Sequence, residues 1–260
     1  MLYTILNKIM NDREILLNSI FFPRPSFKEK DSKDHLVQVE ENIDVGVRFF
    51  LADKNNPTIL FFHGNAELSQ EYDDIAYYYN MHNCNFIVAD YRGYGLSTGS
   101  PTKDNLHADS SEIFNYVKSF LNENKYNGKI IIMGRSLGSA SACEIISKHS
   151  SDIDGCIIES GFGTEIPLMR ILDLTPDDVQ YDPKYGFENL RKIVGYNGPL
   201  FVIHAQMDDI IPLEEGELMH EKSESSQKEI WIVEHANHNN IMMYTHQEYF
   251  KKIKSFIDSI

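Results

Sequence analysis

The chain has 260 residues, of which 42% are hydrophobic and 24% charged, which is enough for one domain with a sizeable core. Its 24 Lys and Arg residues against 39 Asp and Glu residues give a formal net charge of -15, which repels polyanions. This balance argues against nucleic acid and anionic membrane surfaces as partners. The three cysteines, Cys84, Cys143 and Cys156, are widely spaced without a CxxC pair, so we expect no disulfide framework, no metal site and a cytoplasmic location.

Residues 1–34 precede the first predicted strands. Apolar residues between Leu2 and Met10 recur at helical spacing, but charged residues between Lys8 and Glu14 interrupt any run long enough to cross a bilayer. We therefore expect an N-terminal helical arm that packs on a domain at 35–260, and no transmembrane segment.

Short apolar runs recur along the rest of the chain, and each has the length of a strand rather than of a helix. These runs lie at 36–39, 45–51, 58–62, 85–89, 129–133, 155–159, 200–204 and 230–233. Segments with helical spacing lie at 104–121, 137–148, 213–222 and 241–260. The alternation predicts an α/β fold with a mostly parallel central sheet, helices on both faces and an antiparallel hairpin formed by the first two strands.

Ligands bind outside the carboxyl ends of the strands in such sheets, so the residues after each run are the first candidates for chemistry. After 129–133 the sequence reads GRSLGS, which places Ser136 between Gly134 and Gly138 at a predicted strand-to-helix turn. Glycine tolerates tight turns and close contacts, and this pattern is typical of a nucleophile elbow that exposes the serine. A plain structural turn is the alternative interpretation.

A serine nucleophile needs a base and an acid that orients the base, and on this architecture the acid comes before the base in the chain. Asp208 and Asp209 follow the strand at 200–204. Spacing alone does not choose between them, and Glu159, at the end of an earlier strand, is a third candidate acid.

Two histidines, His235 and His238, follow the last predicted strand. His235 sits closer to the strand, where its side chain could point into the core, whereas His238 lies in the loop and is placed to reach Ser136. We interpret the remaining histidines, His63 among them, as structural or surface residues.

An acyl-transfer site also needs N–H donors for the oxyanion that forms. The backbone N–H of Leu137 follows the serine at the start of a predicted helix. The loop HGNAE after the strand at 58–62 offers a second donor, the backbone N–H of Asn65 or Ala66.

The segment DYRGYGLSTGSPT at 90–102 has three glycines and a proline, as a long ordered loop would. Arg92 has the donor fork that binds a carboxylate. We favour a structural role in which Asp90 and Arg92 pair and hold this loop.

Taken together, HGNAE, DYRGYGLSTGSPT, GRSLGS, the aspartate loop before Ile211 and the AxH motif followed by Asn239 resemble the alpha/beta-hydrolase superfamily. Within it the chain resembles small, short-capped serine hydrolases, a group that includes bacterial esterases and alpha/beta-hydrolase-domain depalmitoylases. The resemblance runs from about Phe21 to the C-terminus. It implies the nucleophile Ser136, the acid Asp208, the base His238, the oxyanion donors Asn65 and Leu137, and neither a cofactor nor a metal.

The sequence therefore predicts a serine hydrolase that cleaves a small carboxylic ester or thioester through an acyl-enzyme, with activity that rises as His238 loses its proton. A peptidase or amidase of the same fold and a catalytically silent binding protein are the alternatives. The cap insertion at about 160–198 is short, so we expect an open site. Four apolar residues of the cap either line an acyl pocket or pack in its core: Leu168, Met169, Ile171 and Leu172. The sequence leaves acyl-chain length and oligomeric state open.

Overall fold

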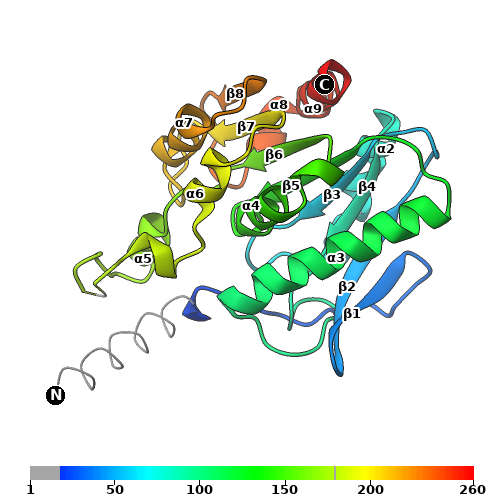
Figure 1. Cartoon of the computed structure of the whole chain (residues 1–260), viewed down its shortest axis with the longest axis horizontal. Helices are drawn as coiled ribbons and strands as arrows, with labels where there is room; N and C mark the ends of the chain where they lie inside the picture. The colour runs from blue at the N-terminus through cyan, green and yellow to red at the C-terminus, as the bar shows by residue number, and fades with distance from the viewer. Residues whose placement is uncertain (1–17, 179) are drawn as a thin grey trace.

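The structure, a computed structural model, describes residues 18–178 and 180–260. Its centre is an eight-stranded sheet with the order β1-β2-β4-β3-β5-β6-β7-β8 (Figure 1). The strands are β1 Asp34–Glu40, β2 Ile43–Phe50, β3 Thr58–Phe62, β4 Asn85–Ala89, β5 Ile130–Arg135, β6 Gly155–Glu159, β7 Leu200–Ala205 and β8 Lys228–Val233. β2 pairs antiparallel with β1 and β4, and all other pairs are parallel. The predicted mostly parallel sheet with an antiparallel hairpin is confirmed.

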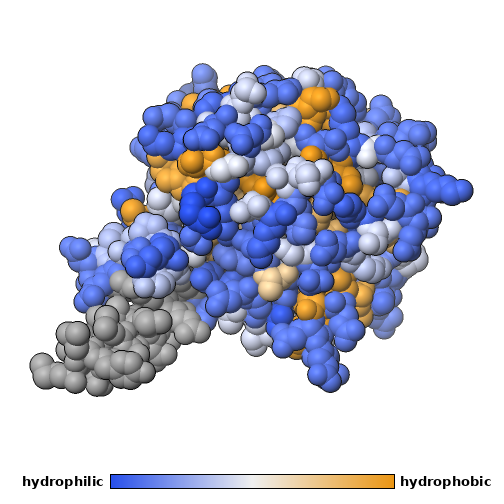
Figure 2. Space-filling model, viewed as in Figure 1, coloured by the Kyte–Doolittle hydropathy of each residue, from blue (hydrophilic) through white to orange (hydrophobic). Residues whose placement is uncertain are grey.

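Helices cover both faces of the sheet. They are α2 Asp73–Met81, α3 Lys103–Glu123, α4 Gly138–Lys148, α5 Ile166–Ile171, α6 Asn189–Val194, α7 Leu213–Lys222, α8 Ile241–Thr245 and α9 Gln247–Ser259, with short 3-10 turns η1 Ser69–Glu71, η2 Ser150–Asp152 and η3 Pro183–Tyr185. The core on one face includes residues of α3, α4, α6 and α7, and the core on the other includes residues of α2, α8 and α9. The face shown in Figure 2 is mostly hydrophilic, with scattered apolar residues.

The central strands are buried on both sides, which explains why their sequences are continuous apolar runs rather than alternating ones. In β3, Leu60 and Phe62 pack in one core, while Ile59 and Phe61 pack in the other. β5, β6 and β7 are buried almost throughout in the same way. Their carboxyl ends lie along one edge of the sheet, where the loops that follow them meet.

The C-terminal segment differs from the single helix predicted at 241–260. The helix breaks at His246, whose φ of 47° and ψ of -123° are incompatible with a helix, so that α8 and α9 are separate. The apolar spacing continues across the break, with Ile241 and Phe250 in the same core, and therefore did not reveal it.

Of the N-terminal helical arm predicted at residues 1–34, the stretch 1–17, which carries the apolar residues at helical spacing, lies outside the described residues. The described residues 18–26 that follow, here called the strap, run across the domain. Pro25 of the strap forms an isolated parallel β-bridge with Gly95. In the described part of the chain, no helix is both long and apolar enough to cross a membrane.

The predicted pairing of Asp90 with Arg92 is wrong. Arg92 turns away and donates two hydrogen bonds of 2.8 Å to Asp109 on α3. Asp90 instead accepts from the backbone N–H of Ser69 at 2.8 Å and contacts His63 Nε2 at 3.0 Å. The two side chains are thus held by partners on different elements, Arg92 by α3 and Asp90 by residues next to β3.

Candidate active site

Ser136 sits at the apex of the turn between β5 and α4. Its φ is 50°, a left-handed conformation that costs free energy in a residue other than glycine and that recurs at functional turns. The turn is held by hydrogen bonds from Ser136 N–H to the Glu159 carbonyl at 2.9 Å and from Ser139 N–H to the Ser136 carbonyl at 3.0 Å. A Cβ at Gly134 would collide with the Gly138 backbone, and one at Gly138 with the carbonyl of Phe62. Both flanking glycines are therefore required by close packing.

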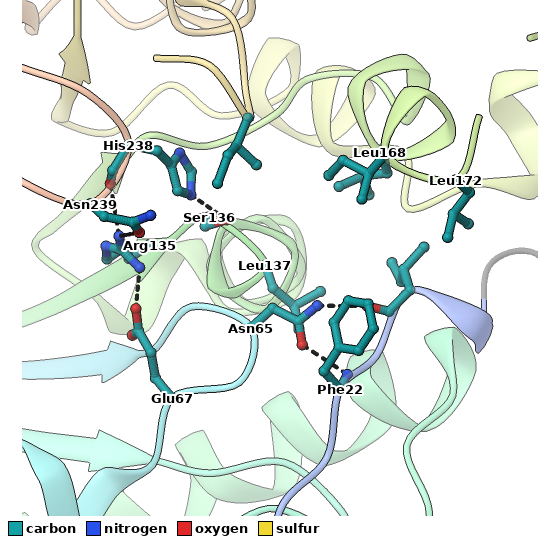
Figure 3. A pocket seen from close by; sticks show the side chains of 13 residues that line it. Phe22, Asn65, Glu67, Arg135, Ser136, Leu137, Leu168, Leu172, His238 and Asn239 are labelled. Carbon is teal, nitrogen blue, oxygen red and sulfur yellow. Dashed lines mark hydrogen bonds and ion pairs between the residues drawn. The ribbon is translucent and has the colours of Figure 1, made fainter. Parts of the chain in front are cut away.

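Two later loops bring an acid and a histidine to this serine. His238, in the loop between β8 and α8, contacts Ser136 Oγ through Nε2 at 3.0 Å (Figure 3). Its Nδ1 lies 2.9 and 2.8 Å from the two carboxylate oxygens of Asp208, in the loop after β7. All three side chains are largely buried, so the structure joins Ser136, His238 and Asp208 in one hydrogen-bonded chain shielded from solvent.

The surroundings of Asp208 favour its ionised form. Burial alone raises the pKa of this carboxyl, but hydrogen bonds from His238 and from the backbone N–H of Ile211, at 2.8 Å, bring it below its ordinary value. Behind it, His204 Nε2 contacts the Ile211 carbonyl at 2.9 Å, and burial lowers the pKa of His204. Asp208 is thus an anionic acceptor for the ring N–H of His238.

The other candidate acids and the other histidine lie elsewhere. Asp209 and His235 are exposed, and His235 does not point into the core. Glu159 is buried, but its carboxylate pairs with Arg135 at 3.3 Å and accepts a hydrogen bond from Tyr249. Geometry therefore selects one of the three acids and one of the two histidines.

Two residues that line the cavity beside Ser136 have a backbone N–H available to bind an oxyanion. Leu137 and Asn65 both line it, and within the described part of the chain neither has an acceptor for its backbone N–H. The backbone N–H of Ala66, the alternative donor, already bonds Asn65 Oδ1 at 3.0 Å. Leu137 precedes the first residue of α4, where a helix leaves its N–H groups unsatisfied.

His63 holds the loop that carries Asn65. Its ring is fully buried, with Nδ1 2.7 Å from the Gly64 carbonyl and Nε2 3.0 Å from Asp90. Burial lowers the pKa of this imidazole, but its bond to Asp90 and that charge raise it above the ordinary value. The structural interpretation of His63 fits these contacts.

A role for Arg135, the residue before the serine, was not predicted from the sequence. Its guanidinium is buried, ion-paired with Glu67 and Glu159, and donates to the His238 carbonyl at 2.8 Å and to Asn239 Oδ1 at 3.0 Å. Burial lowers the pKa of Arg135, yet the two carboxylates raise it overall, so it stays charged. A charged residue inside an otherwise apolar strand end was the available signal.

A cavity of about 280 Å³ opens in front of Ser136. Its polar end, on one side of Ser136, is lined by Glu67, Arg135 and Asn239 (Figure 3). Its apolar end is lined by Ile20, Phe22, Leu168, Ile171, Leu172 and Ile210. Of the four cap residues in question, only Met169 packs away from the cavity, in a small cluster with Leu174 and Tyr181. Among the described residues no group of three or more His, Cys, Asp or Glu side chains is placed to hold a metal ion.

A serine on a strand-to-helix turn of a mostly parallel sheet, faced by loops after later strands, defines the class of alpha/beta hydrolases. A family model described as serine aminopeptidase, S33, matches residues 53–172. The chain is 32% identical over 203 residues to alpha/beta hydrolase domain-containing protein aho-3 of Caenorhabditis elegans, covering 77% of this chain and 57% of that protein. It is 30% identical over 208 residues to the human alpha/beta hydrolase domain-containing protein 17C, covering 79% and 59%.

Solved structures show the same fold. The esterase Pf2001 of Pyrococcus furiosus superposes with a TM-score of 0.73 at 18% identity, covering 91% of this chain and 98% of that one. Est1E of Butyrivibrio proteoclasticus with bound ferulic acid superposes with a TM-score of 0.70 at 16% identity, covering 87% and 100%. The chain belongs to the alpha/beta-hydrolase superfamily, as its motifs predicted. It spans less than two thirds of the length of the two curated relatives described here.

Proposed function

We propose that this chain is a serine hydrolase that cleaves carboxylic ester or thioester bonds of small acyl substrates without a cofactor. The observation that carries the proposal is the chain of hydrogen bonds from Ser136 Oγ through His238 to Asp208. Two relatives by sequence are named hydrolase domain proteins, and the structural neighbour Pf2001 is named an esterase, which supports the reaction class.

In this mechanism His238 Nε2 takes the proton of Ser136 as Oγ attacks the acyl carbonyl carbon. The oxyanion is held by the N–H groups of Leu137 and Asn65, which have no acceptor within the described residues. The protonated His238 then gives its proton to the leaving oxygen or sulfur, and the acyl group stays on Ser136. The same histidine then deprotonates a water molecule, which attacks the acyl-enzyme and releases the acyl group from Ser136 as a carboxylic acid. Asp208 fixes the imidazole tautomer throughout.

The nearest alternative is an aminopeptidase, since the matching family model carries that description. Such an enzyme needs a free carboxylate for the substrate ammonium. The acidic residue that lines the described cavity, Glu67, already accepts from Arg135, Tyr72 and the Gly64 N–H. The apolar end offers no charged group either, which favours an acyl ester or thioester.

The direct test is Ser136→Ala. We expect turnover of short p-nitrophenyl esters and labelling by a fluorophosphonate probe to fall at least about 10³-fold, to background. Ser147→Ala is the matched control, because Ser147 lies on α4, is exposed and does not line the cavity.

Three substrate classes separate the alternatives. Esters and thioesters turned over well above aminoacyl arylamides support the proposal, and the reverse order supports the peptidase. Well-folded protein that neither labels nor hydrolyses any of them is a binding protein, and the proposal is then wrong.

A further inference from the structure

The two ends of the cavity differ in what they can hold. In the proposed mechanism His238 protonates the leaving group. His238 lies next to the polar end, where Arg135 donates a hydrogen bond to the His238 backbone carbonyl. The leaving group therefore departs on the polar side of Ser136. The remaining part of the substrate, the acyl chain, is directed to the apolar end.

The apolar end is built mostly from two segments that lie outside the sheet, and Ile210 in the loop after β7 completes its lining. One wall comes from Leu168, Ile171 and Leu172, at α5 of the cap, and the opposite wall from Ile20 and Phe22 of the strap. Figure 3 shows Phe22 facing Leu168 and Leu172 across the cavity. The two walls are far apart in sequence, so neither was visible as a site from spacing alone.

The strap wall is fixed in place by the loop that carries an oxyanion donor. Asn65 Nδ2 donates to the Ile20 carbonyl at 2.6 Å, and Asn65 Oδ1 accepts from Phe22 N–H at 3.0 Å. The Tyr94 hydroxyl donates to the same Asn65 oxygen at 2.7 Å. The wall is therefore preformed, and it moves only if the Asn65 loop moves with it.

The size of the apolar end limits the length of the acyl chain that it can hold. The whole cavity has a volume of about 280 Å³, at the lower end of the roughly 300–1,000 Å³ found for small-molecule sites. The ester group and the polar end occupy part of this volume, so the apolar end has room for an acyl chain of short to medium length. At the rim, Phe22 and Ile171 are 53% and 51% exposed, so a longer chain passes into water.

We infer that the apolar end, formed mostly by α5 and the strap, is an acyl subsite that takes an unbranched acyl chain of short to medium length. An acyl chain that extends beyond the rim gains no further affinity. This inference rests on the proposed function, since it requires an acyl-enzyme on Ser136. Each methylene buried before the rim raises kcat/KM by up to roughly fourfold, and methylenes beyond it contribute little.

The test is kcat/KM for p-nitrophenyl esters from acetyl to hexadecanoyl, all below their critical micelle concentrations. We expect a rise from acetyl to about hexanoyl and then a plateau. Leu168→Trp fills the subsite, so turnover of the hexanoyl ester falls at least tenfold while that of the acetyl ester changes less than threefold. Arg170→Trp is the matched control, because this side chain lies on the same helix, is exposed and does not line the cavity.

A second variant acts on the opposite wall. Phe22→Ala removes a rim contact, so the hexanoyl-to-acetyl ratio falls by roughly fourfold or more. Phe27→Ala, whose side chain is 99% exposed on the segment that follows the strap, leaves the ratio unchanged. Labelling by a small fluorophosphonate shows for each variant whether the fold and Ser136 remain intact.

The outcomes separate the two proposals. Wild-type protein without Ser136-dependent turnover contradicts the proposed function itself. Active wild-type protein whose chain-length profile is unchanged in both wall variants overturns the acyl subsite and leaves the proposed function standing, as does a profile that climbs evenly to hexadecanoyl.

Discussion

The two ends of the cavity are built in opposite ways. The polar end comes from the ends of sheet strands and is held by buried charges, with Arg135 tying together Glu67, Glu159 and the His238 loop. The apolar end comes mostly from α5 and the strap, which lie outside the sheet and are partly exposed at the rim. The difference teaches that the reaction depends on the sheet, whereas selectivity depends on peripheral segments that can change without disturbing the chemistry.

The largest effect that separates the two ends is expected from Asp208→Asn. The amide keeps the shape of the side chain but no longer fixes the His238 tautomer, so kcat falls by roughly 10⁴-fold. The ratio of hexanoyl to acetyl turnover stays the same, because the substitution lies outside α5 and the strap, which form most of the apolar end. Steady-state kinetics on both esters checks this, with Asp209→Asn as the control because Asp209 is the exposed neighbour. A changed ratio would show that the two ends are not independent.

Arg135→Met tests the buried charges of the polar end. The substitution leaves the Glu159 carboxylate buried without its cation and the His238 carbonyl without its donor. Removing one partner of a buried ion pair costs about 3–5 kcal/mol, so the free energy of unfolding falls by about this amount. Guanidinium unfolding followed by circular dichroism measures the loss.

The double variant Arg135→Met with Glu159→Gln is the control for this explanation. With the buried carboxylate neutralised, the second substitution should recover part of the stability, which gives a positive coupling between the two sites. If the two losses simply add, the buried charge of Glu159 is not the cause.

Much of the sheet could be predicted from sequence because β3 to β7 are buried on both sides, so their apolar runs stand out against polar loops. The break at His246 was missed, since a backbone turn in the middle of continuous apolar spacing leaves the pattern intact. The Arg92 partner was missed for a related reason. Ion pairs between distant segments depend on tertiary packing, and Asp109 is 17 positions away in the chain.

At the site, chain order and resemblance were sufficient to name Ser136, Asp208 and His238, which the structure places in contact. Spacing alone left Asp209, Glu159 and His235 open, because it does not tell which loop side chains turn inward. The strap wall was not foreseen at all. Ile20 and Phe22 are held at the cavity by hydrogen bonds to Asn65 and Tyr94, both more than 40 positions later in the chain.

Buried charges are not confined to the polar end, because the cap that forms one wall of the apolar end is also anchored by them. Lys192 of α6 pairs with Glu144 of α4 at 2.6 Å, and its Nζ lies 3.2 Å from Nε2 of His107 on α3. Burial and the nearby Lys192 charge lower the pKa of His107 to about 4. This imidazole therefore stays neutral in the folded protein over a range where it is protonated in the unfolded chain.

The smallest of these effects is the pH dependence that follows from His107. Between its unfolded pKa of about 6.5 and its folded pKa of about 4, the unfolded state binds the proton and the folded state does not. Stability is therefore lost as pH falls through this window, by at most about 3 kcal/mol. His107→Gln removes the titration, so its free energy of unfolding should fall less steeply than that of the wild type between pH 7 and pH 4. Urea unfolding at several pH values measures both slopes, and parallel curves would show that His107 titrates normally and that its contact with Lys192 does not keep it neutral.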